Sequence, residues 1–120
     1  MKFCWTTLQV KDMEASLAFY ETIVDLKLMR RFSPTDDMEI VFLGEGSTQV
    51  ELICNKKEGK DASCDGFSLG FVTKSLDDTM NFIHSKGIKI ESGPYQPNPH
   101  TRFIYVQDPD GYTVQFVEFI

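Results

Sequence analysis

A repeated order of strands and helices limits the possible folds of this chain more than any other feature. One amphipathic segment follows Asp12 and a second follows Ser75, and each comes after one expected strand and before further expected strands. The two halves match at a spacing of about 63 residues. The matched pairs are Trp5 with Phe67, Phe19 with Phe82, and Glu51 with Gln115. This repeat predicts two βαβββ modules and therefore an α+β fold.

The first module is expected to contain one helix and four strands. Asp12 predicts where the helix begins, because an aspartate side chain can accept hydrogen bonds from the free amides of the first turn. Met13, Leu17 and Tyr20 then follow at helical spacing and predict a buried stripe. The expected strands are residues 3–10, 26–32, 38–43 and 48–54, with a turn or mobile loop at 33–37.

The second module ends in a predicted hairpin. Two runs rich in β-branched and aromatic residues flank residues 108–111, whose sequence Asp-Pro-Asp-Gly suits a tight turn. Upstream, Ser75 and Asp78 form a capping box for the second helix, and Gly87 is placed to end that helix. The remaining expected elements are strands at 67–72 and 88–91 and a long loop with three prolines at 92–101.

The length fits one domain, expected over residues 1–120. Module 1 covers about residues 1–55, a polar linker about 56–65, and module 2 about 66–120. A content of 42% apolar and 25% charged residues is typical of a globular protein with a real core. The net charge of −6 argues against nucleic-acid binding, which needs a basic face, but it leaves room for a small anion held by one local arginine.

The cysteines and the hydropathy pattern bear on location. Cys4, Cys54 and Cys64 are an odd number without zinc-type spacing, so we expect reduced thiols. No stretch approaches the ~20 apolar residues that a membrane span needs. We therefore expect no membrane contact and a cytoplasmic location.

Two segments carry a family resemblance. Residues 8–20, LQVKDMEASLAFY, and residues 108–112, DPDGY, resemble the vicinal oxygen chelate superfamily, which includes glyoxalase I, bleomycin-resistance proteins, fosfomycin-resistance enzymes and extradiol dioxygenases. The resemblance covers nearly the whole chain. It implies two βαβββ modules that form a curved mixed sheet around a cavity, with the helices on the outer face. It also implies a homodimer.

The resemblance also indicates where a metal would be bound. Metal-dependent members similar to glyoxalase I place one histidine or glutamate ligand on the first and last strand of each module. These positions carry over to Trp5, Glu51, Phe67 and Gln115. Only Glu51 offers the expected chemistry, because an indole N–H is a donor only and a phenyl ring has no lone pair to offer. We therefore expect no metal and no other cofactor.

In place of a metal site, the resemblance implies an aromatic cavity with a few polar groups. The expected ligand-binding residues are Trp5, Glu51, Phe67, Leu69, Phe71, Arg102 and Gln115. Arg102 is expected at the cavity mouth, where it could clamp a carboxylate or phosphate. Tyr95 and Tyr105 are further candidates for the rim. The predicted function is metal-free binding of a small apolar or aromatic molecule.

Two alternatives remain open. The chain could instead be a lyase or isomerase resembling glyoxalase I, that is, lactoylglutathione lyase, which would use Glu51 together with an unexpected metal. A buried Glu51 could also serve as a proton-transfer base. The aromatic rings could instead fill the cavity as core, which would leave an interaction protein. Metal content separates the enzyme from the binding protein, and an empty or filled cavity separates the binding protein from the interaction protein.

Overall fold

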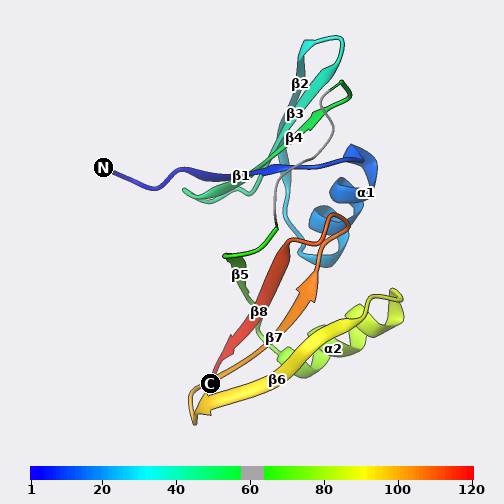
Figure 1. Cartoon of the computed structure of the whole chain (residues 1–120). Coiled ribbons are helices and arrows are strands. Elements are labelled where there is room, and N and C mark those ends of the chain that lie inside the picture. Colours follow the sequence, from blue (N-terminus) through cyan, green and yellow to red (C-terminus); the bar gives the residue numbers. More distant parts are fainter. Residues whose placement is uncertain (58–63) are drawn as a thin grey trace. The chain divides into compact units, whose positions relative to one another are not determined.

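The computed structural model describes residues 1–57 and 64–120, which form two compact units divided between Ser63 and Cys64 (Figure 1). Each unit contains a four-stranded mixed sheet with helical structure after its first strand. The predicted α+β fold of two βαβββ modules is thus confirmed. Part of the expected linker, residues 58–63, lies outside the described residues.

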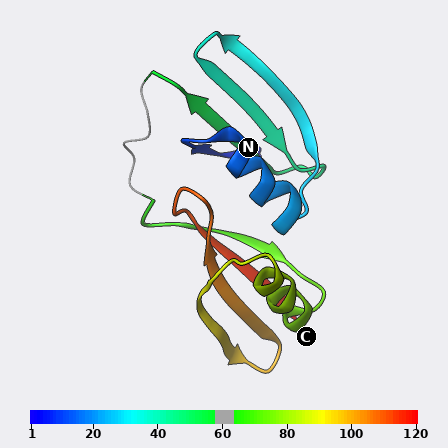
Figure 2. The ribbon, with the colours of Figure 1, turned by 90° about the vertical axis from the view of Figure 1, so that its right-hand side faces the viewer.

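The first unit follows the predicted order of elements. Its elements are β1 (Trp5–Gln9), α1 (Met13–Ala18), the π-helical turn η1 (Phe19–Ile23), β2 (Leu28–Thr35), β3 (Met38–Leu43) and β4 (Gln49–Asn55). The strands lie in the order β1-β4-β3-β2, with β1 parallel to β4 and the other pairs antiparallel. Figure 2 shows this sheet and its helix after a quarter turn.

The core of the first unit lies between the helix and one face of the sheet. The backbone N–H of Ala15 donates to the Asp12 carboxylate at 3.2 Å, as the predicted N-cap requires. The predicted helical stripe is buried, and Leu8, Val41 and Leu52 on the strands are fully buried. Side chains alternate along a strand, so every second residue of each strand points to the other face of this sheet. That face carries no helix of its own unit and can present a site.

The second unit repeats this plan. Its elements are β5 (Ser68–Val72), α2 (Leu76–Ser85), β6 (Ile90–Asn98), β7 (Thr101–Gln107) and β8 (Thr113–Phe119). The strand order is β5-β8-β7-β6, with β5 parallel to β8. The predicted capping box is present, since the N–H of Asp78 donates to the Ser75 hydroxyl at 3.2 Å. Leu76 and Ile83 of α2 are fully buried, as is Ile104 of β7.

The predicted hairpin turn is present between β7 and β8. The buried carboxylate of Asp108 accepts hydrogen bonds from the N–H groups of Asp110 and Tyr112, both at 2.9 Å. Gly111 has a φ of 95°, a conformation that glycine adopts without steric cost. One side chain therefore organises the turn.

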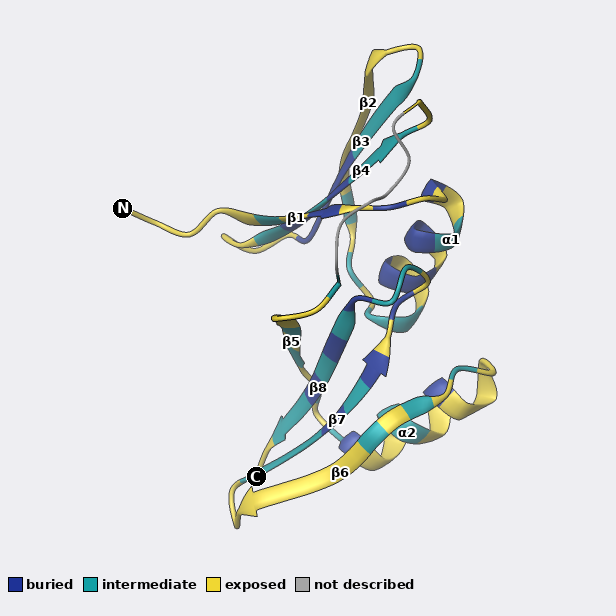
Figure 3. Cartoon of the chain, in the orientation of Figure 1, coloured by how far each residue is buried: buried dark blue, intermediate teal, exposed yellow. Residues whose placement is uncertain are grey.

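Two segments predicted as loops are strands. β2 continues to Thr35, so only the tip of residues 33–37 forms the turn. β6 runs from Ile90 to Asn98 through Pro94 and Pro97, where a long loop was expected. Prolines are tolerated there because β6 is an edge strand that pairs only with β7. Its exposure along most of its length is visible in Figure 3.

Candidate functional site

The open face of the first sheet gathers aromatic and charged side chains from all four strands. In the register, Glu51 of β4 lies opposite both Thr7 of β1 and Phe42 of β3. Phe42 in turn lies opposite Arg30 of β2. Residues paired in register share a face, and Trp5 shares it with Thr7 because the two are separated by one residue. We call this set of residues the Phe42 face.

The ring of Phe42 is the floor of this face. It is only 3% exposed, although it lies on the face opposite the helix of its own unit. Trp5 meets it edge-on with ring centroids 5.1 Å apart, and Phe32 stacks against it at 6.5 Å. The Arg30 guanidinium lies 4.4 Å from the Phe42 ring centroid. Trp5 remains 43% exposed, so its ring is available to a ligand.

Glu51 supplies the carboxylate of the Phe42 face. It is half-buried, and the hydroxyl of Thr7 donates a hydrogen bond to its Oε1. A carboxylate has further lone pairs and can accept a hydrogen bond from a ligand as well. Trp5 and Glu51 therefore share one face, as the sequence predicts.

The second sheet also has an open face, which carries Gln115. The register places Gln115 of β8 opposite Gly70 of β5 and Tyr105 of β7. Its side-chain amide donates to the Tyr105 hydroxyl at 3.4 Å. The rings of Tyr95 and Phe103 lie 6.3 and 5.5 Å from that of Tyr105. These three aromatic residues line a shallow groove of about 460 Å³.

Leu69 and Phe71 do not share the face of Gln115, which corrects the expected arrangement. They pair in register with Val114 and Phe116, which are buried on the helix side, and the rings of Phe71 and Phe116 lie 6.5 Å apart. The prediction that Leu69 and Phe71 share a face with Gln115 is therefore wrong. The two side chains belong to the core side of the sheet.

Phe67 is likewise not the counterpart of Trp5. In the first sheet, Thr7 pairs with Glu51, and Trp5 lies two residues before Thr7. In the second sheet, Gly70 pairs with Gln115, and Ser68 lies two residues before Gly70. Ser68 is therefore the counterpart of Trp5. Phe67 precedes β5, and its ring lies 5.8 Å from that of Tyr112. The repeat is offset by one residue there, and the open face gains a small hydroxyl instead of a ring.

Arg102 also lies on the helix side of its sheet. Its guanidinium is 3.2 Å from the carboxylate of Asp77 on α2 and 3.7 Å from that of Glu118 on β8. Glu118 also accepts a hydrogen bond from the N–H of Leu76 at the start of α2. Arg102 therefore ties the helix to the sheet, and two carboxylates already balance its charge. This contradicts its expected place at the mouth of a cavity.

The donor set does not fit a metal of the glyoxalase type. The four positions, with Ser68 in place of Phe67, offer an indole, one carboxylate, a hydroxyl and an amide. Zinc and nickel sites need imidazole, thiolate and carboxylate donors. Within residues 1–57 and 64–120, no three His, Cys, Asp or Glu side chains lie close enough together to hold a metal ion. Of the histidines, His84 lies on α2 and His100 in the turn before β7.

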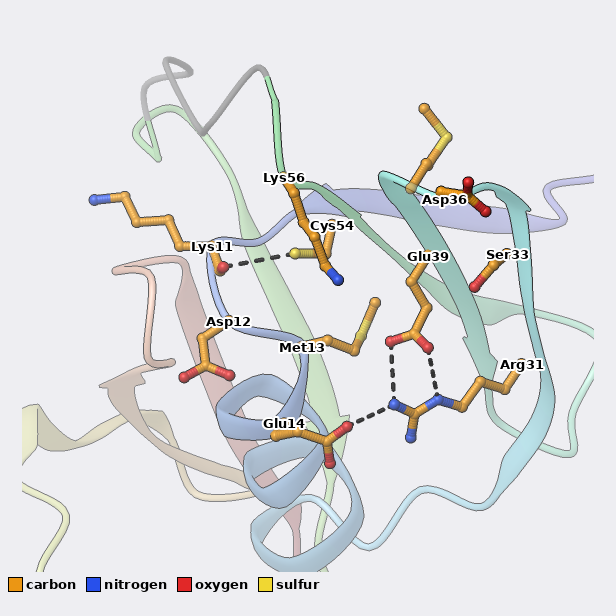
Figure 4. Close-up of a pocket in the computed structure, with 11 residues that line it drawn as sticks. Lys11, Asp12, Met13, Glu14, Arg31, Ser33, Asp36, Glu39, Cys54 and Lys56 are labelled. Atoms are coloured by element: carbon orange, nitrogen blue, oxygen red, sulfur yellow. Dashed lines mark hydrogen bonds and ion pairs between the residues drawn. The ribbon is translucent and has the colours of Figure 1, made fainter.

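A separate polar cleft of about 520 Å³ lies on the helix side of the first sheet (Figure 4). Arg31 of β2 binds both carboxylate oxygens of Glu39 at 3.1 Å and also binds Glu14 of α1. Hydrogen bonds to Glu39 and Glu14 raise the pKa of Arg31 above its usual value. Arg31 and Arg30 are adjacent in sequence, so their side chains lie on opposite faces of the sheet.

Thr7, Arg30 and Phe42 belong to the Phe42 face, but the sequence did not single them out as candidates. The alternation of β3 offered a signal, because Ile40 and Phe42 lie on the face opposite Val41 and Leu43. To predict that these residues are neighbours, one needs to know how the strands pair residue by residue, and the local sequence does not give this register.

The fold and the open aromatic faces define a two-module α+β protein of the glyoxalase type, and comparison with known proteins agrees. Residues 2–116 match the family model of the Glyoxalase/Bleomycin resistance protein/Dioxygenase superfamily, and the chain belongs to this family. The vicinal oxygen chelate resemblance is thereby confirmed.

Curated relatives of similar length are lactoylglutathione lyases. The protein of Neisseria meningitidis serogroup A is 31% identical, with 98% of this chain and 91% of the relative covered. That of Haemophilus influenzae is 29% identical, with 98% and 93% covered. Among solved structures, a glyoxalase family protein from Bacillus cereus matches with a TM-score of 0.87 and 15% identity, over 100% of this chain and 95% of that one.

Among the helices that the structure describes, none has the length and apolar character needed to cross a bilayer.

Proposed function

We propose that this protein binds a small aromatic molecule on the Phe42 face without a metal. The observation that supports the proposal is the floor itself: a ring buried in the sheet, with Trp5 exposed beside it and the Glu51 carboxylate in the neighbouring register position. Apolar walls with few placed polar groups are typical of small-molecule sites. The unsuitable donor set at the four family positions supports metal-free binding.

Each residue of this site has a role in the proposal. Trp5 stacks on the ligand, and Phe42 holds Trp5 by an edge-on contact. Glu51, oriented by Thr7, accepts a hydrogen bond from a hydroxyl or amine of the ligand. On the second sheet, Gln115 and Tyr105 are proposed as polar ligand contacts of their own face. Leu69, Phe71 and Arg102 have no part in ligand binding in this proposal.

A second candidate function is a lyase or isomerase in which Glu51 acts as a base. The curated lactoylglutathione lyases at 29% and 31% identity favour it. The chain's own donor set argues against a metal-assisted version of that reaction. Elemental analysis of freshly purified protein, together with an assay on the hemithioacetal of methylglyoxal and glutathione, separates the two functions. A stoichiometric metal with metal-stimulated turnover would favour the enzyme.

We also propose that the protein is a homodimer, as the family resemblance implies, and that it is cytoplasmic, as the odd number of cysteines and the hydropathy pattern suggest. Light scattering at micromolar concentration tests the dimer. A monomer mass would remove that part of the proposal and leave the Phe42 face unaffected.

The fluorescence of Trp5 tests the binding proposal, because it is the one tryptophan of the chain. A panel of small aromatic compounds should include some that quench or shift its emission saturably. Substitution of Trp5 by Leu should weaken the binding of those compounds by about 2- to 12-fold, measured by calorimetry, because a ring contact contributes about 0.5–1.5 kcal/mol. No saturable response across the panel would favour the interaction protein.

A further inference from the structure

We propose that the Phe42 face selects aromatic molecules that carry a carboxylate, and that Arg30 is the residue that binds this group. The inference rests on the proposed function and deepens it, because it names the class of ligand. From the sequence alone, Arg102 is the expected anion-binding residue. The structure gives reasons to place it at Arg30.

The three arginines of the chain differ in how their charge is balanced. Arg31 is held by Glu39 and Glu14, and Arg102 by Asp77 and Glu118. Across the part of the chain that the structure describes, Arg30 has no carboxylate within ion-pair distance. Its guanidinium instead lies over two rings, 4.4 Å from the centroid of Phe42 and 5.5 Å from that of Phe32. Of the three arginines, Arg30 is therefore the one available to an added anion.

The aromatic contact prepares Arg30 for this role. A guanidinium that lies over a ring uses its face for the contact, and the N–H groups at its edge stay free to donate. Two of these N–H groups can bind both oxygens of one carboxylate. The rings restrict the side chain before the ligand arrives, so less rotamer freedom is lost on binding.

The register sets the shape of the ligand. Arg30, Phe42 and Glu51 are neighbours on three consecutive strands, β2, β3 and β4. Adjacent strands lie about 4.8 Å apart, so the backbones of the two charged residues are about 10 Å apart with an aromatic floor between them. A flat ring can lie on this floor with a carboxylate toward Arg30 and a hydroxyl or amine toward Glu51. A hydroxybenzoate has this arrangement of groups.

The charges on this face also discriminate between ligands. Glu51 would repel a second anionic group placed at its end of the site, and Arg30 would disfavour a cationic group at the other. A ligand with one carboxylate and one hydrogen-bond donor satisfies both ends. The whole chain has a net charge of −6, which disfavours anionic ligands, and a local positive group such as Arg30 would offset this repulsion.

The test compares 4-hydroxybenzoate with its neutral analogue 4-hydroxybenzamide on the complete chain, using Trp5 emission and calorimetry. The wild-type protein should bind the carboxylate about tenfold or more tightly, because hydrogen bonds to charged groups are the stronger ones. Arg30→Gln should remove this preference, while Arg30→Lys should keep part of it. Arg31→Gln is the matched control: it removes the same charge one residue away on the other face and should keep the full preference.

The outcomes distinguish the two proposals. Equal binding of the two compounds by the wild-type protein, or a preference that survives Arg30→Gln, would overturn the role of Arg30 and leave the binding proposal standing. Binding of neither compound, with no response to the wider aromatic panel, would remove both proposals. Arg30 is an exposed side chain, so its loss should not unfold the sheet. Circular dichroism of each variant checks that the fold is intact.

Discussion

Substitution of Phe42 by Leu should uncouple the residues of the Phe42 face. The change keeps an apolar side chain in β3 but removes the ring that Trp5, Phe32 and Arg30 contact. Each ring pair contributes about 0.5–1.5 kcal/mol beyond burial, and an exposed cation–π contact about 0.5–1 kcal/mol. We therefore expect the free energy of unfolding to fall by about 1.5–4 kcal/mol.

A double-mutant cycle isolates the contact between Trp5 and Phe42. Urea unfolding of the wild-type protein, Trp5→Leu, Phe42→Leu and the double variant should give a coupling energy of about 0.5–1.5 kcal/mol. Circular dichroism is the readout, because Trp5→Leu removes the tryptophan. A parallel cycle of Trp5 with Phe19, which lies in η1 and contacts Tyr20, should give a coupling near zero. A coupling near zero in the first cycle as well would refute the ring contact on which the site depends.

The other predictions concern the hairpin turn and the ion pairs of Arg31. Asp108→Ala should lower the free energy of unfolding by about 1–3 kcal/mol, because the N–H groups of Asp110 and Tyr112 lose their acceptor, and Asp108→Asn should lower it less. Arg31→Ala should cost only about 0.5–1 kcal/mol, since its partners are partly exposed and screened by water, and the cost should shrink in high salt. Because the pKa of Arg31 is raised in the folded state, its ion pairs stabilise the fold fully at every pH below the usual pKa of arginine. Raising the pH to 9 should therefore leave the stabilisation by Arg31 unchanged in urea unfolding. A large loss in either Arg31 test would show that these ion pairs do more than join α1 to the sheet.

Local chemistry made several elements predictable from sequence. Asp12 and Ser75 bind the amides of their own helices, and Asp108 binds those of its own turn. Each of these interactions spans at most four residues, so the sequence states both partners. The two-module fold followed from the repeat of such local signals.

The errors arose where distant parts of the chain decide the outcome. Side chains alternate with a period of two, so a one-residue offset between the repeats moved the predicted position from Ser68 to Phe67 and carried Leu69 and Phe71 to the wrong face. The prolines of residues 92–101 indicated a loop, but the edge position of β6 tolerates them.

The arginines show the same limit. Nothing in the local sequence shows that Asp77 and Glu118 surround Arg102, or that Arg30 lies over Phe42. These partners come from strand neighbours and from a helix packed on the sheet. The candidate for anion binding therefore moved from Arg102 to Arg30 only when the register was known.

The most direct test of metal-free binding on the Phe42 face is an NMR titration. Nitrogen-15-labelled protein, treated with EDTA and dialysed, is titrated with 4-hydroxybenzoate, and the amide shifts are followed residue by residue. The account predicts saturable shifts centred on Trp5, Arg30, Phe42 and Glu51, with the polar cleft around Arg31 serving as the internal reference. Shifts that appear only after a divalent metal is added, or that centre on the helix side of the first sheet, would contradict it.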